Sequence, residues 1–164
     1  MANVSRCGVK KISSHVLCNC PTDPHTTVLM KVNNNFVMKK GLIKPIIRIK
    51  RAYDKPLKKD GYRVLVDRLW PRGVQKEAAA FDEWAVDLAP SAALRNWWGH
   101  DPETWIMFKK RYLTELMGSR APVDFMCNHA NKKVITLVYG AKDIEHNHAI
   151  VLQQYLEQQN KQKA

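Results

Sequence analysis

Three stretches of the chain show the patterns of apolar and polar residues that β-strands show. Ile46–Lys50 is a short β-branched run that ends in alternation, and residues 62–67 form a second run after the turn pair Asp60-Gly61. Residues 134–139 are almost continuously apolar. β-Branched and aromatic residues between turn signals favour strands, and a continuous apolar run is typical of a strand buried on both faces. The pattern predicts three strands.

Helical periodicity marks three further segments. The clearest begins at Asp101-Pro102-Glu103, where a carboxylate precedes proline and a second acid, as at the start of many helices. Its apolar stripe consists of Trp105, Phe108, Tyr112 and Leu116. A shorter helix is predicted over 91–98, and a last one from about 147 to 158 that buries Ile150, Leu152, Tyr155 and Leu156. Strands that alternate with helices predict a single three-layer α/β domain, with a small, partly parallel sheet flanked by helices.

The first 37 residues differ from the rest. They lack sustained periodicity apart from the short run 27–30, which is compatible with one strand. We therefore expect residues 1–37 to be an irregular N-terminal extension, disordered and dispensable for folding, and residues 38–164 to form the α/β domain. Residues 1–37 hold four basic and one acidic side chain, so the domain keeps a net charge of +9 out of +12.

Composition narrows the class of protein. The chain has 164 residues, of which 45% are hydrophobic, which is enough for one substantial core. No apolar run approaches the roughly 20 residues that cross a membrane, and no signal peptide is recognisable, so we expect no membrane partner. Four cysteines are too few for a disulfide scaffold, which favours the cytoplasm. The net charge of +12 favours anionic partners.

Polar side chains follow two of the predicted strands. They are Asp67, Arg68 and Arg72 after the second strand, and Lys142, Asp143, His146 and Asn147 after the last. Ligands of open α/β sheets bind beyond the carboxyl ends of strands, so neighbouring strands would bring these residues to one crevice. Guanidinium groups and the start of a helix bind carboxylates and phosphates. We expect Arg68, Arg72, Lys142 and Asn147 to bind an anion, and Asp67 and His146 to be a catalytic acid–base pair.

Other residues that bind metals or nucleic acids give weaker patterns. Asp143, His146 and His148 would form a metal site only with strained geometry, because residues two apart diverge on a helix, so we assign no metal and no cofactor. Cys18 and Cys20, with Cys7 and His25, lack the usual spacing of zinc ligands. The four residues Trp84, Trp97, Trp98 and Trp105 fit a helix-face core better than a base-stacking platform. Trp70 alone falls within the predicted crevice.

The same segments resemble the domain of unknown function 488 family, in its YeaO-like branch, over residues 45–157. The matching stretches are 47–51, 53–54, 61–73, 88–91, 94–95, 99–103, 139–143 and 145–149. The resemblance implies a small cytoplasmic α/β protein and no settled activity. Other branches look as if they place a Cys-His-Arg triplet where this chain has His146-Asn147-His148, and the cysteine is absent here.

Three functions remain open from the sequence. The first is a small protein that binds an anionic small molecule in the basic crevice, with acid–base chemistry by Asp67 and His146 if it is an enzyme. The second is a basic protein that associates nonspecifically with nucleic acid, although no helix-turn-helix, zinc-finger or RNA-recognition motif is present. The third is a divalent-metal binder through Asp143 and His146. The pattern does not indicate an oligomeric state.

Overall fold

The computed structural model describes residues 30–32, 35–37, 44–99 and 101–161. The chain divides into two units, Met1–Gly41 and Leu42–Ala164. In the first unit, strands β1 (Met30–Val32) and β2 (Asn35–Val37) pair antiparallel. Most of the predicted extension, including residues 27–29 of the run considered as a strand, lies outside the described residues.

The second unit is built around a four-stranded sheet. Its strands are β3 (Ile46–Arg51), β4 (Tyr62–Leu65), β5 (Glu83–Trp84) and β6 (Val134–Tyr139). They lie in the order β3-β6-β4-β5, and every pair of neighbours in this sheet is parallel. The three predicted strands are confirmed, and so is the parallel pairing, which every pair of neighbours in this sheet shows. β5 is an addition that the sequence did not reveal.

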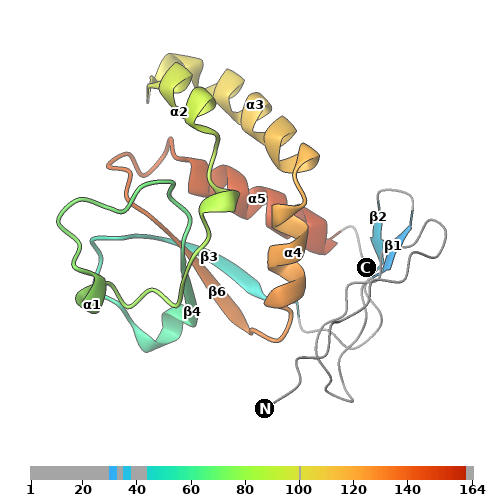
Figure 1. Cartoon of the computed structure of the whole chain (residues 1–164), viewed down its shortest axis with the longest axis horizontal. Helices are drawn as coiled ribbons and strands as arrows, with labels where there is room; N and C mark the ends of the chain where they lie inside the picture. Colours follow the sequence, from blue (N-terminus) through green and yellow to red (C-terminus); the bar gives the residue numbers. More distant parts are fainter. Residues whose placement is uncertain (1–29, 33–34, 38–43, 100, 162–164) are drawn as a thin grey trace, which may run out of the picture. The chain divides into compact units, whose positions relative to one another are not determined.

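Helices follow or precede each strand of this sheet. The α-helices are α1 (Lys76–Ala79), α2 (Ala92–Trp98), α3 (Trp105–Gly118), α4 (Ala121–Asn128) and α5 (His148–Lys161). Three 3-10 turns are η1 (Lys58–Asp60), η2 (Val86–Leu88) and η3 (Pro102–Thr104). Figure 1 shows α2 and α3 together above the strands and α5 running alongside β3 and β6. The three predicted helices are confirmed as α2, α3 and α5.

Local sequence explains where these helices begin. The side chain of Asp101 accepts a hydrogen bond from the backbone N–H of Glu103, as its position before proline predicted. The hydroxyl of Ser91 accepts one from Leu94 N at 3.1 Å and so caps α2. Phe108, with Tyr112 and Leu116 on the same stripe of α3, is buried. The caps thus explain where η3 and α2 begin, and the apolar stripe explains which face of α3 is buried.

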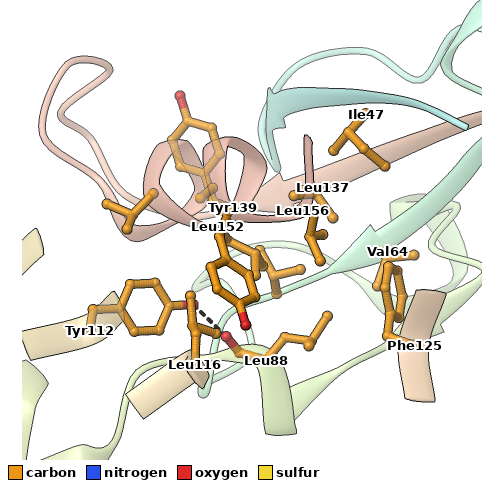
Figure 2. Packing of buried hydrophobic residues seen from close by; sticks show 14 of the residues in the cluster. Ile47, Val64, Leu88, Tyr112, Leu116, Phe125, Leu137, Tyr139, Leu152 and Leu156 are labelled. Carbon is orange, nitrogen blue, oxygen red and sulfur yellow. Dashed lines mark hydrogen bonds between the residues drawn. The ribbon is translucent and has the colours of Figure 1, made fainter. Parts of the chain in front are cut away.

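The hydrophobic core lies between the sheet and helices α2 to α5. Figure 2 shows Ile47, Val64 and Leu137 of the sheet packed among side chains of α3, α4 and α5. The buried hydroxyl of Tyr112 in α3 donates to the carbonyl oxygen of Leu88, the bond drawn dashed in Figure 2. Burial raises the pKa of Tyr112, with smaller contributions from nearby carboxylates, so this hydroxyl stays a hydrogen-bond donor.

A thinner layer covers the opposite face of the sheet. Thr136 Oγ1 donates to the carbonyl oxygen of Asp60, the last residue of η1, at 2.6 Å. Arg63 Nε donates to the carbonyl oxygen of Ala80, which follows α1, at 3.0 Å. The domain therefore has the predicted three layers, with one face covered by long helices and the other by short turns. Among the described helices, none is both long and apolar enough to cross a membrane.

Candidate functional site

The loops after β4 and β6 meet at one edge of the sheet. Leu65 of β4 is opposite Val138 of β6 in a parallel pair, so both strands end at the same edge. The backbone N–H of Gly140 donates to Asp67 Oδ2 at 2.5 Å and joins the two loops directly. Both loops lie at the left of the sheet in Figure 1. The ends of β4 and β6 therefore lie next to each other, as the sequence predicted.

Asp67 also contacts the first residue of α5. His148 Nε2 lies 3.2 Å from Asp67 Oδ1 and 3.1 Å from the carbonyl oxygen of Val66. The His148 side chain is buried, and both carboxylate oxygens of Asp67 have a partner. Among the described residues, no hydrogen bond or ion pair joins Asp67 to His146, the other residue of the expected acid–base pair.

His146 pairs with Asp143 instead. Asp143 Oδ1 accepts the backbone N–H groups of Glu145 at 2.7 Å and His146 at 3.0 Å, and Oδ2 lies 2.9 Å from His146 Nδ1. These bonds, first that from the backbone of His146 and then that from Glu145, hold the pKa of Asp143 below its ordinary value. The His146 ring packs edge-on against Trp105, with centroids 5.4 Å apart. The pair orders the turn that leads into α5.

Asn147 caps α5 from a buried position. Its Oδ1 accepts the backbone N–H of Ile150 at 3.1 Å. Its Nδ2 donates to the carbonyl oxygens of Asp143 and Ile144, each at 3.2 Å. All hydrogen-bonding groups of this side chain are used within the loop. The structure therefore gives Asn147 the role of a helix cap, and the side chain has no free donor for the anion that we expected it to bind.

The three candidate metal ligands are divided between two pairs. His148 is bonded to Asp67, and His146 to Asp143. Within residues 44–99 and 101–161, no three side chains of His, Cys, Asp or Glu are grouped as a metal ion requires. The other candidates, Cys7, Cys18, Cys20 and His25, lie outside the described residues.

The remaining predicted site residues are cations in solvent. Arg68 and Arg72 lie on the loop after β4, Lys142 lies on the loop after β6, and all three side chains are exposed. None of them hydrogen-bonds to, or forms an ion pair with, another described residue. Three cations thus stand on two loops that Asp67 joins, which is an arrangement that can attract and hold an anion.

An aromatic group beside these cations was missed in the sequence. Trp84 lies on β5 and is 43% exposed, so its prediction as part of a helix-face core is wrong. Trp84 Nε1 donates to the carbonyl oxygen of Asp67 at 2.7 Å. Trp70 packs against both Trp84 and Phe81. A two-residue strand has no periodicity, so nothing in the sequence indicated that β5 brings Trp84 next to Asp67.

The fold and the joined loops define the class of protein: a small α/β protein whose central parallel strands are followed by loops that carry the exposed side chains of Arg68, Arg72 and Lys142. Residues 46–164 match the sequence model described as the inactive DUF488-N3 subclade. The chain therefore belongs to the DUF488 family.

Two relatives of this chain have names that state no activity. The chain is 41% identical over 110 residues to the uncharacterized protein YeaO of Escherichia coli strain K12. The aligned region covers 67% of this chain and 96% of YeaO. It is also 38% identical over 110 residues to the uncharacterized protein Rv3073c of Mycobacterium tuberculosis strain H37Rv. That aligned region covers 67% of this chain and 92% of Rv3073c. No solved structure matches. These matches identify the family of the chain, but none of the printed names states a reaction.

Proposed function

We propose that the protein binds an anionic small molecule at the basic edge, which we define as Arg68, Arg72 and Lys142 on the loops after β4 and β6. The observation that carries the proposal is that these three exposed cations lack a partner among the described residues. They also stand on loops that the Asp67–Gly140 hydrogen bond holds together, so the two backbones that carry them are joined. A joined backbone loses less conformational entropy than two separate loops would when a ligand binds.

The proposal is for binding without turnover. Asp67 has a partner on each carboxylate oxygen, so it supports the loops and is poorly placed to accept a proton from a ligand. The matching family model is described as inactive, which agrees with a binding role. His146, held by Asp143 on the same edge, then helps to shape the loop after β6. The small number of cysteines keeps the cytoplasm as the proposed location.

The experiment compares two double variants that remove the same charge. R68M/R72M removes two cations of the basic edge, and K110M/K133M removes two exposed lysines on α3 and before β6. Binding of pyrophosphate and citrate is measured by calorimetry at fixed ionic strength. Each charge-assisted contact contributes about 1.5–3 kcal/mol, so R68M/R72M should weaken binding by about a hundredfold or more.

The control separates a site from a general surface field. K110M/K133M should bind within about threefold of the wild type, because two charges outside the basic edge change the overall potential little. Equal weakening in both variants would mean that the anion responds to total charge, as it does in nonspecific association with nucleic acid. If neither pyrophosphate nor citrate binds the wild type, the proposal is wrong.

A further inference from the structure

Trp84 is held beside the basic edge with much of its surface in solvent. It follows Glu83 on β5, opposite Leu65 of β4, and Ala85 N donates to the carbonyl oxygen of Leu65 at 2.9 Å. The bond from Trp84 Nε1 to the Asp67 carbonyl oxygen fixes the indole next to the residue that precedes Arg68. The exposed indole of Trp84 is therefore held against the loop that carries Arg68 and Arg72.

The surroundings of this indole combine aromatic and positive groups. Trp70 lies with its ring centroid 5.6 Å from that of Trp84, at an interplanar angle of 78°. Trp70 Nε1 donates to the carbonyl oxygen of Val74 at 2.6 Å, so this ring is fixed as well. Lys76 Nζ lies 5.9 Å from the Trp70 ring centroid. Trp70 itself stands between Arg68 and Arg72 in the loop.

This combination favours a ligand with two different parts. Guanidinium groups recognise phosphate through paired hydrogen bonds, and an exposed indole offers a flat surface on which an aromatic ring can stack. A simple inorganic anion uses only the cations and leaves the indole in water. A nucleotide uses both, because it carries phosphate and an aromatic base in one molecule.

We propose that the anion of the basic edge is a nucleotide, with its phosphates on Arg68 and Arg72 and its base stacked on the exposed surface of Trp84. This inference rests on the proposed function and adds the class of ligand. Both tryptophan Nε1–H groups are already bonded to backbone carbonyls. Trp84 and Trp70 therefore offer a stacking surface without a hydrogen bond that would read the base, so the site binds purine and pyrimidine bases with little discrimination.

The test compares ADP with pyrophosphate, which has the same phosphate group and no base. Calorimetry on the full chain should show ADP binding about tenfold or more tighter than pyrophosphate, the difference that one base–aromatic stack gives. In W84L the two affinities should become equal. In W84F, which keeps a smaller aromatic ring and loses the fused pyrrole ring with its N–H, part of the preference for ADP should remain.

Trp97 provides a matched control for the loss of an exposed indole. It lies on α2 and is 42% exposed, against 43% for Trp84. W97L and W97F should keep the full preference for ADP. ADP should also quench the tryptophan emission of the wild type and of W97F, and quench that of W84F much less, so the base is located even if W84L does not fold.

The outcomes distinguish this inference from the proposed function. If ADP and pyrophosphate bind the wild type equally, the basic edge binds anions and the stacking proposal is wrong. A preference for ADP that W84F and W84L leave unchanged, with unchanged quenching, also overturns it, since the base then lies elsewhere. Binding of single-stranded oligonucleotides without binding of ADP overturns it in favour of a nucleic-acid surface. If neither probe binds the wild type, the anion site itself is wrong.

Discussion

Asp67 is the residue on which the geometry of the basic edge depends most. One of its carboxylate oxygens is bonded to the loop after β6 through Gly140 N, and the other lies next to His148 at the start of α5. Its own backbone carbonyl accepts the indole N–H of Trp84. The side chain and the carbonyl of Asp67 thus connect its loop to β5, to the loop after β6 and to α5.

Gly140 tests how closely these loops approach each other. A Cβ added to Gly140 would lie 2.8 Å from Asp67 Oδ2 and 3.4 Å from Pro71 Cβ, so the carboxylate would have to move. G140A should therefore weaken the hydrogen bond to Asp67 and lower the free energy of unfolding by about 1–3 kcal/mol. Urea denaturation of the wild type and of G140A measures this difference.

Gly118 is the matched position for this test. It is the last residue of α3, and nothing lies within 4 Å of a Cβ added to it. G118A should leave stability unchanged or raise it by up to about 1 kcal/mol, as Gly-to-Ala changes do where the backbone allows alanine. If G140A is as stable as G118A, the close approach of Asp67 does not restrict this position.

At the scale of the elements, a buried ion cluster holds three strands and η1 together. Asp60 Oδ2 accepts hydrogen bonds from Lys50 Nζ at 2.7 Å, Arg63 Nη1 at 2.6 Å and Leu57 N at 3.0 Å. The Asp60 carbonyl oxygen accepts one from Thr136 on β6. Asp60 therefore links β3, β4 and β6 on the face of the sheet opposite the long helices. Because Asp60 is polar, no apolar pattern marks it, and the sequence predicts it only as part of a turn.

Removing the charge of Asp60 should cost stability in a way that depends on pH. Burial by itself would raise the pKa of Asp60, but the bonds from Lys50, Leu57 and Arg63 outweigh it, and the pKa lies below its ordinary value of 3.8. The carboxylate therefore stabilises the fold above pH 3.8, and this contribution is lost as the pH falls through the lower folded-state value. D60N should lower the free energy of unfolding by about 3 kcal/mol near neutral pH.

The pH dependence distinguishes charge from shape in this test. The difference between the wild type and D60N in urea denaturation should shrink below pH 3.8 and stay constant through the neutral range. D124N serves as the control, because the Arg120–Asp124 pair has side chains 59% and 44% exposed and should contribute less than about 1 kcal/mol. A difference for D60N that is the same at all pH values would show that the carboxylate charge is not what stabilises the cluster.

The sequence predicted those elements that have a long enough pattern. Residues 134–139 and the stripe of α3 were found because five apolar residues in a run of six, or four on one helix face, leave few alternatives. α1 and β5 have four and two residues and carry no period, so they were missed. The meeting of the loops after β4 and β6 at one edge of the sheet also followed from the sequence, because neighbouring parallel strands end at the same edge.

The pairing of side chains at that edge did not follow from the sequence. Asp67, His146 and His148 were all identified, but which histidine reaches Asp67 depends on where α5 begins. α5 starts at His148, after the cap that Asn147 provides, and so His148 is turned towards Asp67 while His146 remains in the preceding turn. A shift of one residue in that start would change the pair, and periodicity does not locate helix ends so closely.

At the scale of the whole molecule, the stability of the protein should come from residues 42–164. The buried core cluster of the described chain runs from Ile47 to Leu156 and is supplied by the second unit. The family match begins at residue 46, and YeaO matches this chain over 96% of its own length. These observations and the lack of an apolar period in residues 1–37 give one expectation for a truncated chain.

A variant without residues 1–37 should fold as the full chain does. We expect it to unfold in one cooperative transition, with a free energy of unfolding within about 1 kcal/mol of the full chain, because no described core residue is removed. It should also keep its affinity for pyrophosphate, since Arg68, Arg72 and Lys142 remain. Thermal and urea denaturation of both chains, followed by calorimetry, provide the comparison. An insoluble truncated chain, or one with a broad non-cooperative transition, would show that residues 1–37 belong to the folded core.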